Sequence, residues 1–210
     1  ERAASVSSSS TESDSAEVDD AATAQSTDSG ADPSAAGDDW RTVEFELPDD
    51  GNWTKSEAGA YTAVGSTNTI AWSKETFEGD LEILLEVTSS SSSLAAANVI
   101  VHGNGSFLSK GNLIFTVASD LLAISETSIF EGEGGRYLRS AAATLDMQDQ
   151  VHTVLISIRD GEASMSLDGE EVGTVLLDDE IRSEGKIGLL KYWGSSEISF
   201  QNIKVREMGP

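Results

Sequence analysis

The sequence predicts an all-β protein in which two antiparallel sheets pack as a sandwich. The clearest signal lies between residues 151 and 205, where apolar and polar residues alternate with period two in successive segments. Two of the breaks are Asp160-Gly161 and Asp168-Gly169, dipeptides that favour the tight turns of β-hairpins. No long amphipathic helical pattern occurs in the chain. Many short strands with frequent turn signals are typical of a two-sheet sandwich.

The first half of the folded region contains six expected strands. They cover residues 42–47, 60–64, 69–72, 80–87, 98–102 and 112–118. Turn residues such as Pro48-Asp-Asp-Gly51 and Gly65-Ser-Thr-Asn68 separate the first three. In the strand 80–87, every second residue from Leu81 to Val87 is apolar. Alternate residues of a strand point to the same face, so this face is expected to be buried.

The second half is expected to form a meander that closes the fold. Its strands cover residues 151–159, 162–167, 172–175, 185–193 and 196–205. In the last strand, Ile198 and Phe200 share one phase, whereas Ile203 and Val205 have the other. A β-bulge near Gln201-Asn202 would bring all four side chains to one face, because a bulge adds one residue to its strand.

Composition divides the chain into a linker, residues 1–39, and a sandwich domain, residues 40–210. The linker contains no Ile, Leu, Phe, Trp, Tyr or Met, and it holds ten acidic residues against one basic residue, Arg2. Such a segment cannot bury enough apolar surface to offset its ordering entropy, so we expect it to be disordered. The remaining 27 acidic and 12 basic residues make the domain acidic as well.

The charge and the missing residue types exclude several classes of function. An acidic domain is repelled by phosphate backbones, so nucleic acid is not an expected partner. No stretch of about 18 apolar residues occurs, and no transmembrane segment is expected. The chain has no Cys, which excludes disulfides, thiol catalysis and thiolate metal sites.

Several short motifs follow one another along the domain in a specific order. They are Gly51-Asn-Trp53, Phe77-Glu-Gly-Asp-Leu-Glu-Ile83, Leu167-Asp-Gly169, Gly185-Lys-Ile-Gly-Leu189 and the closing segment Ile198–Val205. In this order, residues 40–207 resemble the concanavalin A-like, laminin G-like jelly rolls of bacterial secreted proteins. In particular, they resemble the 3-keto-disaccharide hydrolase-like domain. The resemblance implies a jelly-roll sandwich and, in members that bind sugars, a site on the concave face of a sheet.

The first candidate residues are Glu82 and Glu86, which share one face of the strand 80–87. The β-glucanases of this fold carry their catalytic acids on one strand, with an Asp between them. Retaining hydrolysis needs two carboxylates about 5–5.5 Å apart. Leu84 stands where the resemblance would place the Asp, so no catalytic residue is predicted here. Both carboxylates remain candidates for binding a glycan, and a solvated strand face is the alternative.

A second set of candidates is polar and shares alternating phases on two further strands. These residues are Asn98, His102, Asn112 and Thr116. If their strands neighbour the strand of Glu82 and Glu86, the six side chains form one patch that could bind sugar hydroxyls. The alternative is an ordinary half-exposed strand face.

Two tryptophans and one acidic loop complete the candidates. Trp53 stands beside a turn and Trp193 precedes Gly194-Ser-Ser196, so either could stack on a sugar ring, with core packing as the alternative. Asp178, Asp179 and Glu180 offer hard oxygen ligands, which makes this loop a candidate site for a structural Ca²⁺. A solvated acidic loop is the alternative there.

Three functions remain open at this stage. The leading one is a non-catalytic glycan-binding or adhesive domain of a secreted or lipid-anchored protein at the surface of a bacterium or archaeon. Its partner would be a carbohydrate or a cell-surface glycan. The second is a glycoside hydrolase-like enzyme acting on a disaccharide or modified disaccharide. The third is a structural subunit of a surface layer or filament, which would self-associate through sheet edges.

Overall fold

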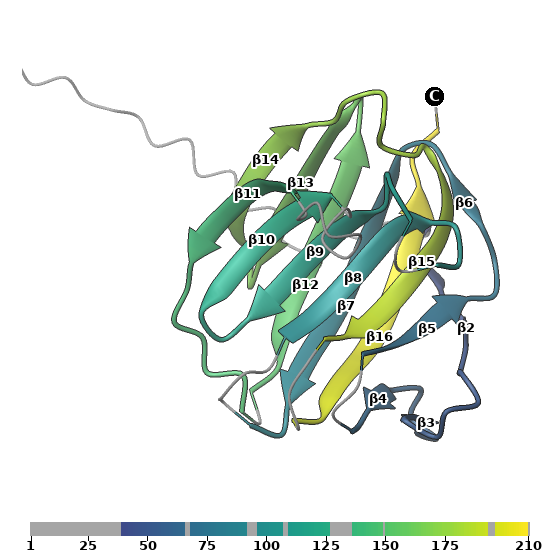
Figure 1. Ribbon diagram of the computed structural model, residues 1–210, viewed down its shortest axis with the longest axis vertical. Coiled ribbons are helices and arrows are strands. Elements are labelled where there is room, and N and C mark those ends of the chain that lie inside the picture. The colour runs from purple at the N-terminus through teal and green to yellow at the C-terminus, as the bar shows by residue number, and fades with distance from the viewer. Residues whose placement is uncertain are drawn as a thin grey trace, which may run out of the picture.

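The computed structural model describes residues 39–65, 68–91, 96–106, 109–126, 136–148, 150–192 and 196–209. All of the regular structure in these residues is β-strand, in sixteen segments that form two sheets (Figure 1). The predicted all-β sandwich is therefore confirmed. The linker predicted over residues 1–39 lies, apart from its last residue, outside the described residues.

Sheet A contains eight strands in the order β14-β13-β12-β7-β16-β4-β3, with β1 also paired to β16. Its strands are β1 (Arg41–Thr42), β3 (Trp53–Lys55), β4 (Tyr61–Ala63), β7 (Leu81–Ser89), β12 (His152–Arg159), β13 (Glu162–Leu167), β14 (Glu170–Leu176) and β16 (Ile198–Glu207). Their pairings are antiparallel throughout. The predicted closing meander is correct only for β12, β13 and β14, because the next strand, residues 184–191, belongs to the other sheet and β16 pairs with β7 and β4.

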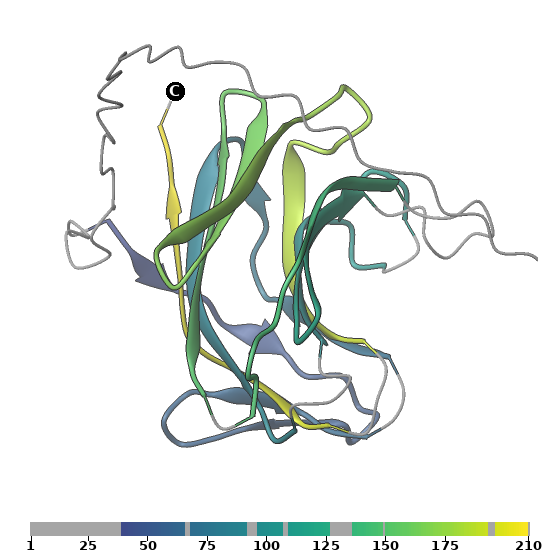
Figure 2. The same cartoon turned by 90° about the vertical axis from the view of Figure 1, so that its left-hand side faces the viewer.

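Sheet B also contains eight strands, in the order β11-β10-β9-β8-β15-β5-β2, with β6 also paired to β15. Its strands are β2 (Phe45–Glu46), β5 (Thr69–Ser73), β6 (Phe77–Glu78), β8 (Ala96–Gly103), β9 (Leu113–Ala118), β10 (Leu121–Glu126), β11 (Arg136–Ala142) and β15 (Glu184–Lys191). Figure 2 views the two sheets from the side and shows them packed face to face.

The core lies between the sheets and follows the predicted alternation. In β7, Leu81, Ile83, Leu85 and Val87 are buried, and the residues between them are only partly buried. Large side chains such as Phe77, Phe115 and Phe200 fill the space between the two inner faces. Each sheet has one nonpolar face. Packing these two faces against each other removes both from water, which stabilises the two-layer arrangement.

The two Asp-Gly hairpins and the β-bulge have the predicted geometry. Asp160 and Gly161 have φ values of 52° and 76°, and Asp168 and Gly169 have 52° and 85°. Two successive positive φ angles define the type I′ turn, whose twist matches that of the flanking strands. In β16 the pairing with β7 shifts between Gln201 and Lys204, and Asn202 has a φ of 53°. The bulge lets Ile203 and Val205 join Phe200 in the core.

No helix in the described part of the chain is long and apolar enough to cross a membrane.

Candidate functional site

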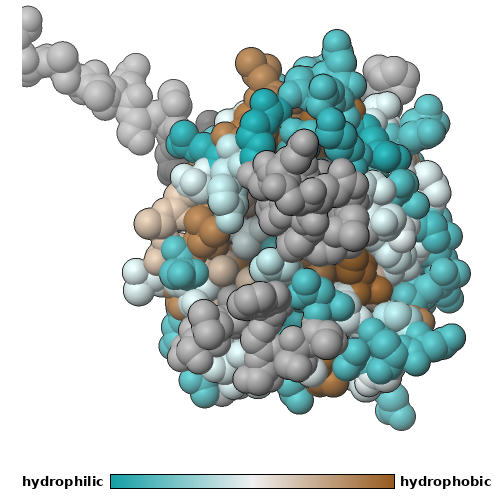
Figure 3. Space-filling view, viewed as in Figure 1, coloured by the Kyte–Doolittle hydropathy of each residue, from teal (hydrophilic) through white to brown (hydrophobic). Residues whose placement is uncertain are grey.

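The outer face of sheet B, which is turned away from the main core, carries a strip of apolar side chains. Ile100, Ile114 and Leu190 are buried and form a cluster separate from the main core. Ile70, Trp72 and Tyr192 are half-buried and pack against it. In the space-filling view of this side of the molecule, small separate hydrophobic patches are visible among hydrophilic surface (Figure 3). The accessible part of this strip is therefore limited to Ile70, Trp72 and Tyr192.

Trp72 lies flat on the backbone of two neighbouring strands. A Cβ atom built on Gly188, in β15, would stand 2.7 Å from Cζ3 of the indole, and one built on Gly103, in β8, would stand 2.4 Å from the same atom. Two glycines thus create the space in which the six-membered ring rests on the sheet. Trp72 is only half-buried, so part of the residue remains open to solvent.

A polar pair lies near Trp72 on the same face. Trp72 pairs across the strands with Gly188, and Gly188 pairs with Ile100, which places Ile100 roughly 10 Å from Trp72. Asn98 lies two residues from Ile100 along β8, on the same face, and pairs with Thr116 of β9. The Thr116 hydroxyl donates a hydrogen bond of 2.7 Å to Oδ1 of Asn98.

The hydrogen bonds of Asn98 are directed inward. Its side-chain amide donates to the carbonyls of Ala96 and Leu190, each at 3.4 Å, and the residue is only 5% exposed. Thr116 is half-buried and presents the more accessible group of the pair. Asn98 therefore orients the Thr116 hydroxyl, and a ligand would meet Thr116 first.

His102 and Asn112 are buried, with 2% and 0% of their surface exposed. The pairing of β8 with β15 shifts near His102, whose φ is 54°, so the alternation that predicted its orientation is interrupted. Its Nδ1 lies 2.9 Å from the carbonyl oxygen of Arg182, and burial lowers the pKa of the imidazole. The Asn112 amide donates to the carbonyl of Ser106. Both side chains stabilise loops at the end of the sheet.

Glu82 and Glu86 do not join this patch, because β7 belongs to sheet A whereas β8 and β9 belong to sheet B. Nε of Arg206 donates to Glu82 at 2.7 Å, and the guanidinium also packs over the ring of Trp40 at 4.9 Å. Glu86 accepts hydrogen bonds from the side-chain amides of Gln201 and Asn202, at 2.9 and 2.8 Å. The two carboxylates thus hold β16 against β7 from the outer face of sheet A. The six predicted polar residues are divided between the two sheets.

Of the two tryptophans that the sequence suggested for stacking on a sugar, the structure describes only Trp53. Trp53 is 5% exposed, stacks on Phe200 with ring centroids 6.1 Å apart, and donates its indole N–H to Thr69. It is a core residue, which was the stated alternative. Trp193 lies outside the described residues.

The acidic loop is not arranged as a metal site. Oδ2 of Asp178 accepts a hydrogen bond of 2.6 Å from Arg136, and Oδ1 accepts one from the backbone of Glu180. The bond to Arg136 lowers the pKa of Asp178. In the part of the chain that the structure describes, no three His, Asp or Glu side chains are grouped so that they could hold a metal ion.

Sequence reasoning missed the residues that define the outer face of sheet B, namely Trp72, Gly103 and Gly188. In the sequence, Trp72 ends a short apolar strand, and nothing distinguishes it from a core residue. The two glycines are 31 and 116 positions away along the chain. Only the pairing of β5, β15 and β8 brings the three residues together.

Comparisons with known proteins reveal similarity in structure and not in sequence. No family model matches the chain, and no curated protein matches it. Among solved structures, a carbohydrate-binding module, CBM66, from Bacillus subtilis has a TM-score of 0.60 at 17% identity, over 80% of this chain and 96% of that one. A β-glucanase from Bacillus licheniformis has a TM-score of 0.57 at 9% identity, over 81% and 92%.

A crystal structure of a putative glycosyl hydrolase from Parabacteroides distasonis is similar as well. Its TM-score is 0.56 at 16% identity, over 80% of this chain and 99% of that one. These identities are low, so the similarity concerns the fold. The resemblance to concanavalin A-like jelly rolls is confirmed at that level: the protein is a jelly-roll β-sandwich.

Proposed function

We propose that this protein is a non-catalytic glycan-binding domain, and that the sugar stacks on Trp72 on the outer face of sheet B. The observation that carries the proposal is the flat position of the half-buried indole on Gly103 and Gly188. A sugar ring has an apolar C–H face and hydroxyls at its edge. An indole lying flat on a sheet offers the surface that such a face needs.

The surroundings of Trp72 support the same proposal. Half-buried Ile70 and Tyr192 add apolar surface on the same face, and Thr116 offers a hydroxyl three strands away, roughly 16 Å from Trp72 between Cα atoms. Pockets for small polar ligands commonly combine apolar surface with a few placed polar groups. Among structurally similar proteins is one described as a carbohydrate-binding module. An extracellular or cell-surface location follows from a glycan partner.

The surroundings of Glu82 and Glu86 favour binding over hydrolysis. A general acid needs a proton at neutral pH, and a nucleophile needs an accessible lone pair. Glu82 is ion-paired with Arg206, and Glu86 accepts two amide hydrogen bonds. Both lie on the sheet opposite to Trp72. We therefore infer that they stabilise the fold.

A glycan array followed by isothermal titration tests this function. The protein should bind at least one glycan, and chromatography of the mixture after prolonged incubation should show that glycan intact. Release of shorter products would instead assign the protein to the hydrolases. Absence of both binding and product release over a broad array would refute a role in glycan recognition.

A further inference from the structure

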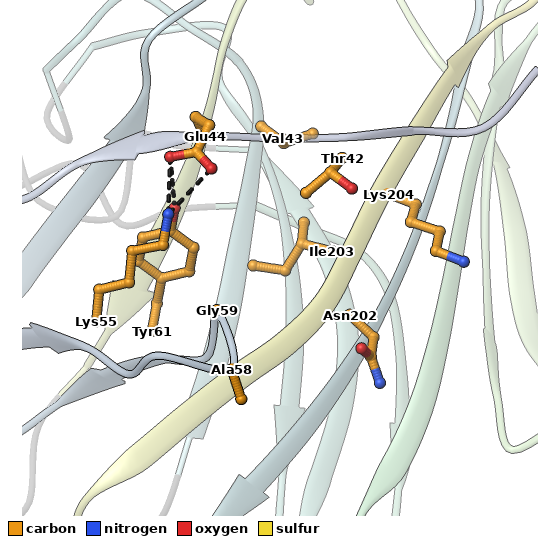
Figure 4. Close-up of a pocket in the computed structure, with 10 residues that line it drawn as sticks. All are labelled: Thr42, Val43, Glu44, Lys55, Ala58, Gly59, Tyr61, Asn202, Ile203 and Lys204. Carbon is orange, nitrogen blue, oxygen red and sulfur yellow. Dashed lines mark hydrogen bonds and ion pairs between the residues drawn. The ribbon is translucent and has the colours of Figure 1, made fainter.

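A separate pocket lies where the chain passes from sheet A to sheet B between β1 and β2 (Figure 4). It encloses about 180 Å³ between this crossing segment, the β3–β4 hairpin and the bulge of β16. The residues that line it are Thr42, Val43, Glu44, Lys55, Ala58, Gly59, Tyr61, Asn202, Ile203 and Lys204. The pocket has none of the residues of the Trp72 site.

An ion pair forms one wall of the pocket. Lys55 Nζ donates to both oxygens of Glu44, at 3.0 and 2.8 Å, as the close-up shows. The side chains are 36% and 53% exposed. The hydrogen bond and the charge of Lys55 lower the pKa of Glu44, so the carboxylate is ionised at neutral pH. The ammonium has a third proton, and the carboxylate has lone pairs beyond those that Lys55 uses. A donor and acceptors thus stand side by side at an accessible position.

Tyr61 holds this ion pair in place. Its ring lies beneath Lys55 Nζ, 5.0 Å from ring centroid to nitrogen, and packs edge-on against Phe45. Its hydroxyl accepts a hydrogen bond from the Phe45 backbone at 3.2 Å and lies 3.5 Å from Glu44 Oε2. Because Tyr61 is 2% exposed, the ring is fixed by packing and the polar wall is preorganised.

The floor of the pocket is apolar, two small residues lie at its rim, and Thr42, Asn202 and Lys204 add polar groups to the lining. Val43 and Ile203 are buried side chains that form the floor. Ala58 and Gly59 lie at the tip of the hairpin, and a Cβ added to Gly59 would meet no atom within 4 Å. The hairpin tip therefore leaves the entrance open.

We propose that this pocket binds a small molecule through a vicinal diol, with one hydroxyl donating to Glu44 and its neighbour accepting from Lys55. The carbon skeleton between the hydroxyls rests on Val43 and Ile203. A paired carboxylate and ammonium match a diol, because each hydroxyl can be both donor and acceptor. Lys204 also lines the pocket and Lys74 Nζ lies 4.0 Å from Glu44 Oε2, so the ligand is selected by the paired donor and acceptor and not by a balance of charge. A sugar ring and a linear polyol both supply this chemistry.

Chemical-shift mapping of the full chain tests the proposal. The protein is titrated with methyl α-mannopyranoside, which has a cis diol, with sorbitol, and with methanol as a control that has no diol. Backbone amides of Ala58 and Gly59 report on the pocket, and the indole N–H of Trp72 reports on sheet B. We expect the sugar or the polyol, and not methanol, to shift the pocket signals with a saturable dependence on concentration. A sugar-only response identifies a ring as the ligand, and an equal response to sorbitol identifies a polyol.

Two variants separate the pocket from the rest of the molecule. Glu44→Ala removes the acceptor, and Ala58→Phe places a ring at the rim without touching the ion pair. Each should weaken binding at the pocket tenfold or more and leave the shifts of Trp72 within twofold of wild type. The proposal is overturned if the pocket signals respond to methanol as they do to the diols, if they never saturate, or if both variants bind like wild type. Loss of the Trp72 response alone would count against the glycan site and not against this pocket.

Discussion

The position of Trp72 can be tested through the glycine beneath it. In Gly188→Ala the new methyl group would stand 2.7 Å from Cζ3 and 3.0 Å from Cε3 of the indole, whereas ordinary contacts begin at 3.4 Å. The ring or the strand must therefore move by about 0.7 Å. Overpacking of this kind costs about 1–3 kcal/mol. A Gly to Ala change also lowers the conformational entropy of the unfolded chain, which stabilises the folded protein by about 0.4–1 kcal/mol.

The net loss should be about 1–2 kcal/mol of unfolding free energy, which lowers the melting temperature by roughly 2–8 °C in a domain of this size. Urea denaturation of wild type, Gly188→Ala, Trp72→Ala and the double variant measures it as a double-mutant cycle. Once the indole is absent, the methyl group has space, so Gly188→Ala should cost nothing in the Trp72→Ala background. An equal cost in both backgrounds would show that the indole does not rest on Gly188.

Three further predictions concern the stability of the sandwich. Gly169→Val should destabilise the fold by about 1–3 kcal/mol through backbone strain, because φ is +85° at this position. A steric clash does not contribute, since no atom lies within 4 Å of the new Cβ. A neutral effect in urea denaturation would mean that the turn readily adopts another form. His152 should stabilise the fold at acidic pH: burial acts to lower its pKa, but hydrogen bonds to Asp168 and to the carbonyl of Asp146 raise it overall. This contribution is complete below the unfolded pKa of about 6.5 and is lost as pH rises through the folded pKa. The loss of stability in His152→Gln should thus be larger at pH 5.5 than at pH 9, and the opposite order would reverse the assigned shift. Finally, because the formal net charge is -24, raising NaCl from about 0.05 to 1 M should raise the melting temperature by screening repulsion; a decrease would show that attractive ion pairs dominate.

The sequence predicted the architecture because sandwich folds depend on local signals. The Asp160-Gly161 and Asp168-Gly169 turns need positive φ at two positions, and few residue pairs other than Asp-Gly and Asn-Gly tolerate this. The phase change in the last strand required one extra residue, and the structure places the bulge at Asn202. Each of these features is encoded within a few neighbouring residues.

The grouping of candidate residues depends on strand order, which local patterns do not contain. Consecutive strands usually lie beside each other, so the sequence alone favours β7 and β8 as neighbours. Here the chain changes sheets between them, which separates Glu86 from Asn98. The orientation of His102 was missed for a different reason, since its positive φ and the shifted pairing interrupt the alternation. The contact of Trp72 with Gly188 is likewise a product of pairing between distant segments.

The most direct test of the account is the affinity of Trp72→Ala for the glycan that gives the strongest signal on the array. Trp40→Ala is the matched control, because Trp40 packs under Arg206, the partner of Glu82 on sheet A. Removing an aromatic anchor at the centre of a binding site typically costs 2 kcal/mol or more. By isothermal titration, Trp72→Ala should therefore bind at least tenfold more weakly than wild type, which is about 1.4 kcal/mol, while Trp40→Ala stays within twofold. Unchanged affinity in a folded Trp72→Ala variant, or an equal loss in Trp40→Ala, would contradict a glycan site on the outer face of sheet B.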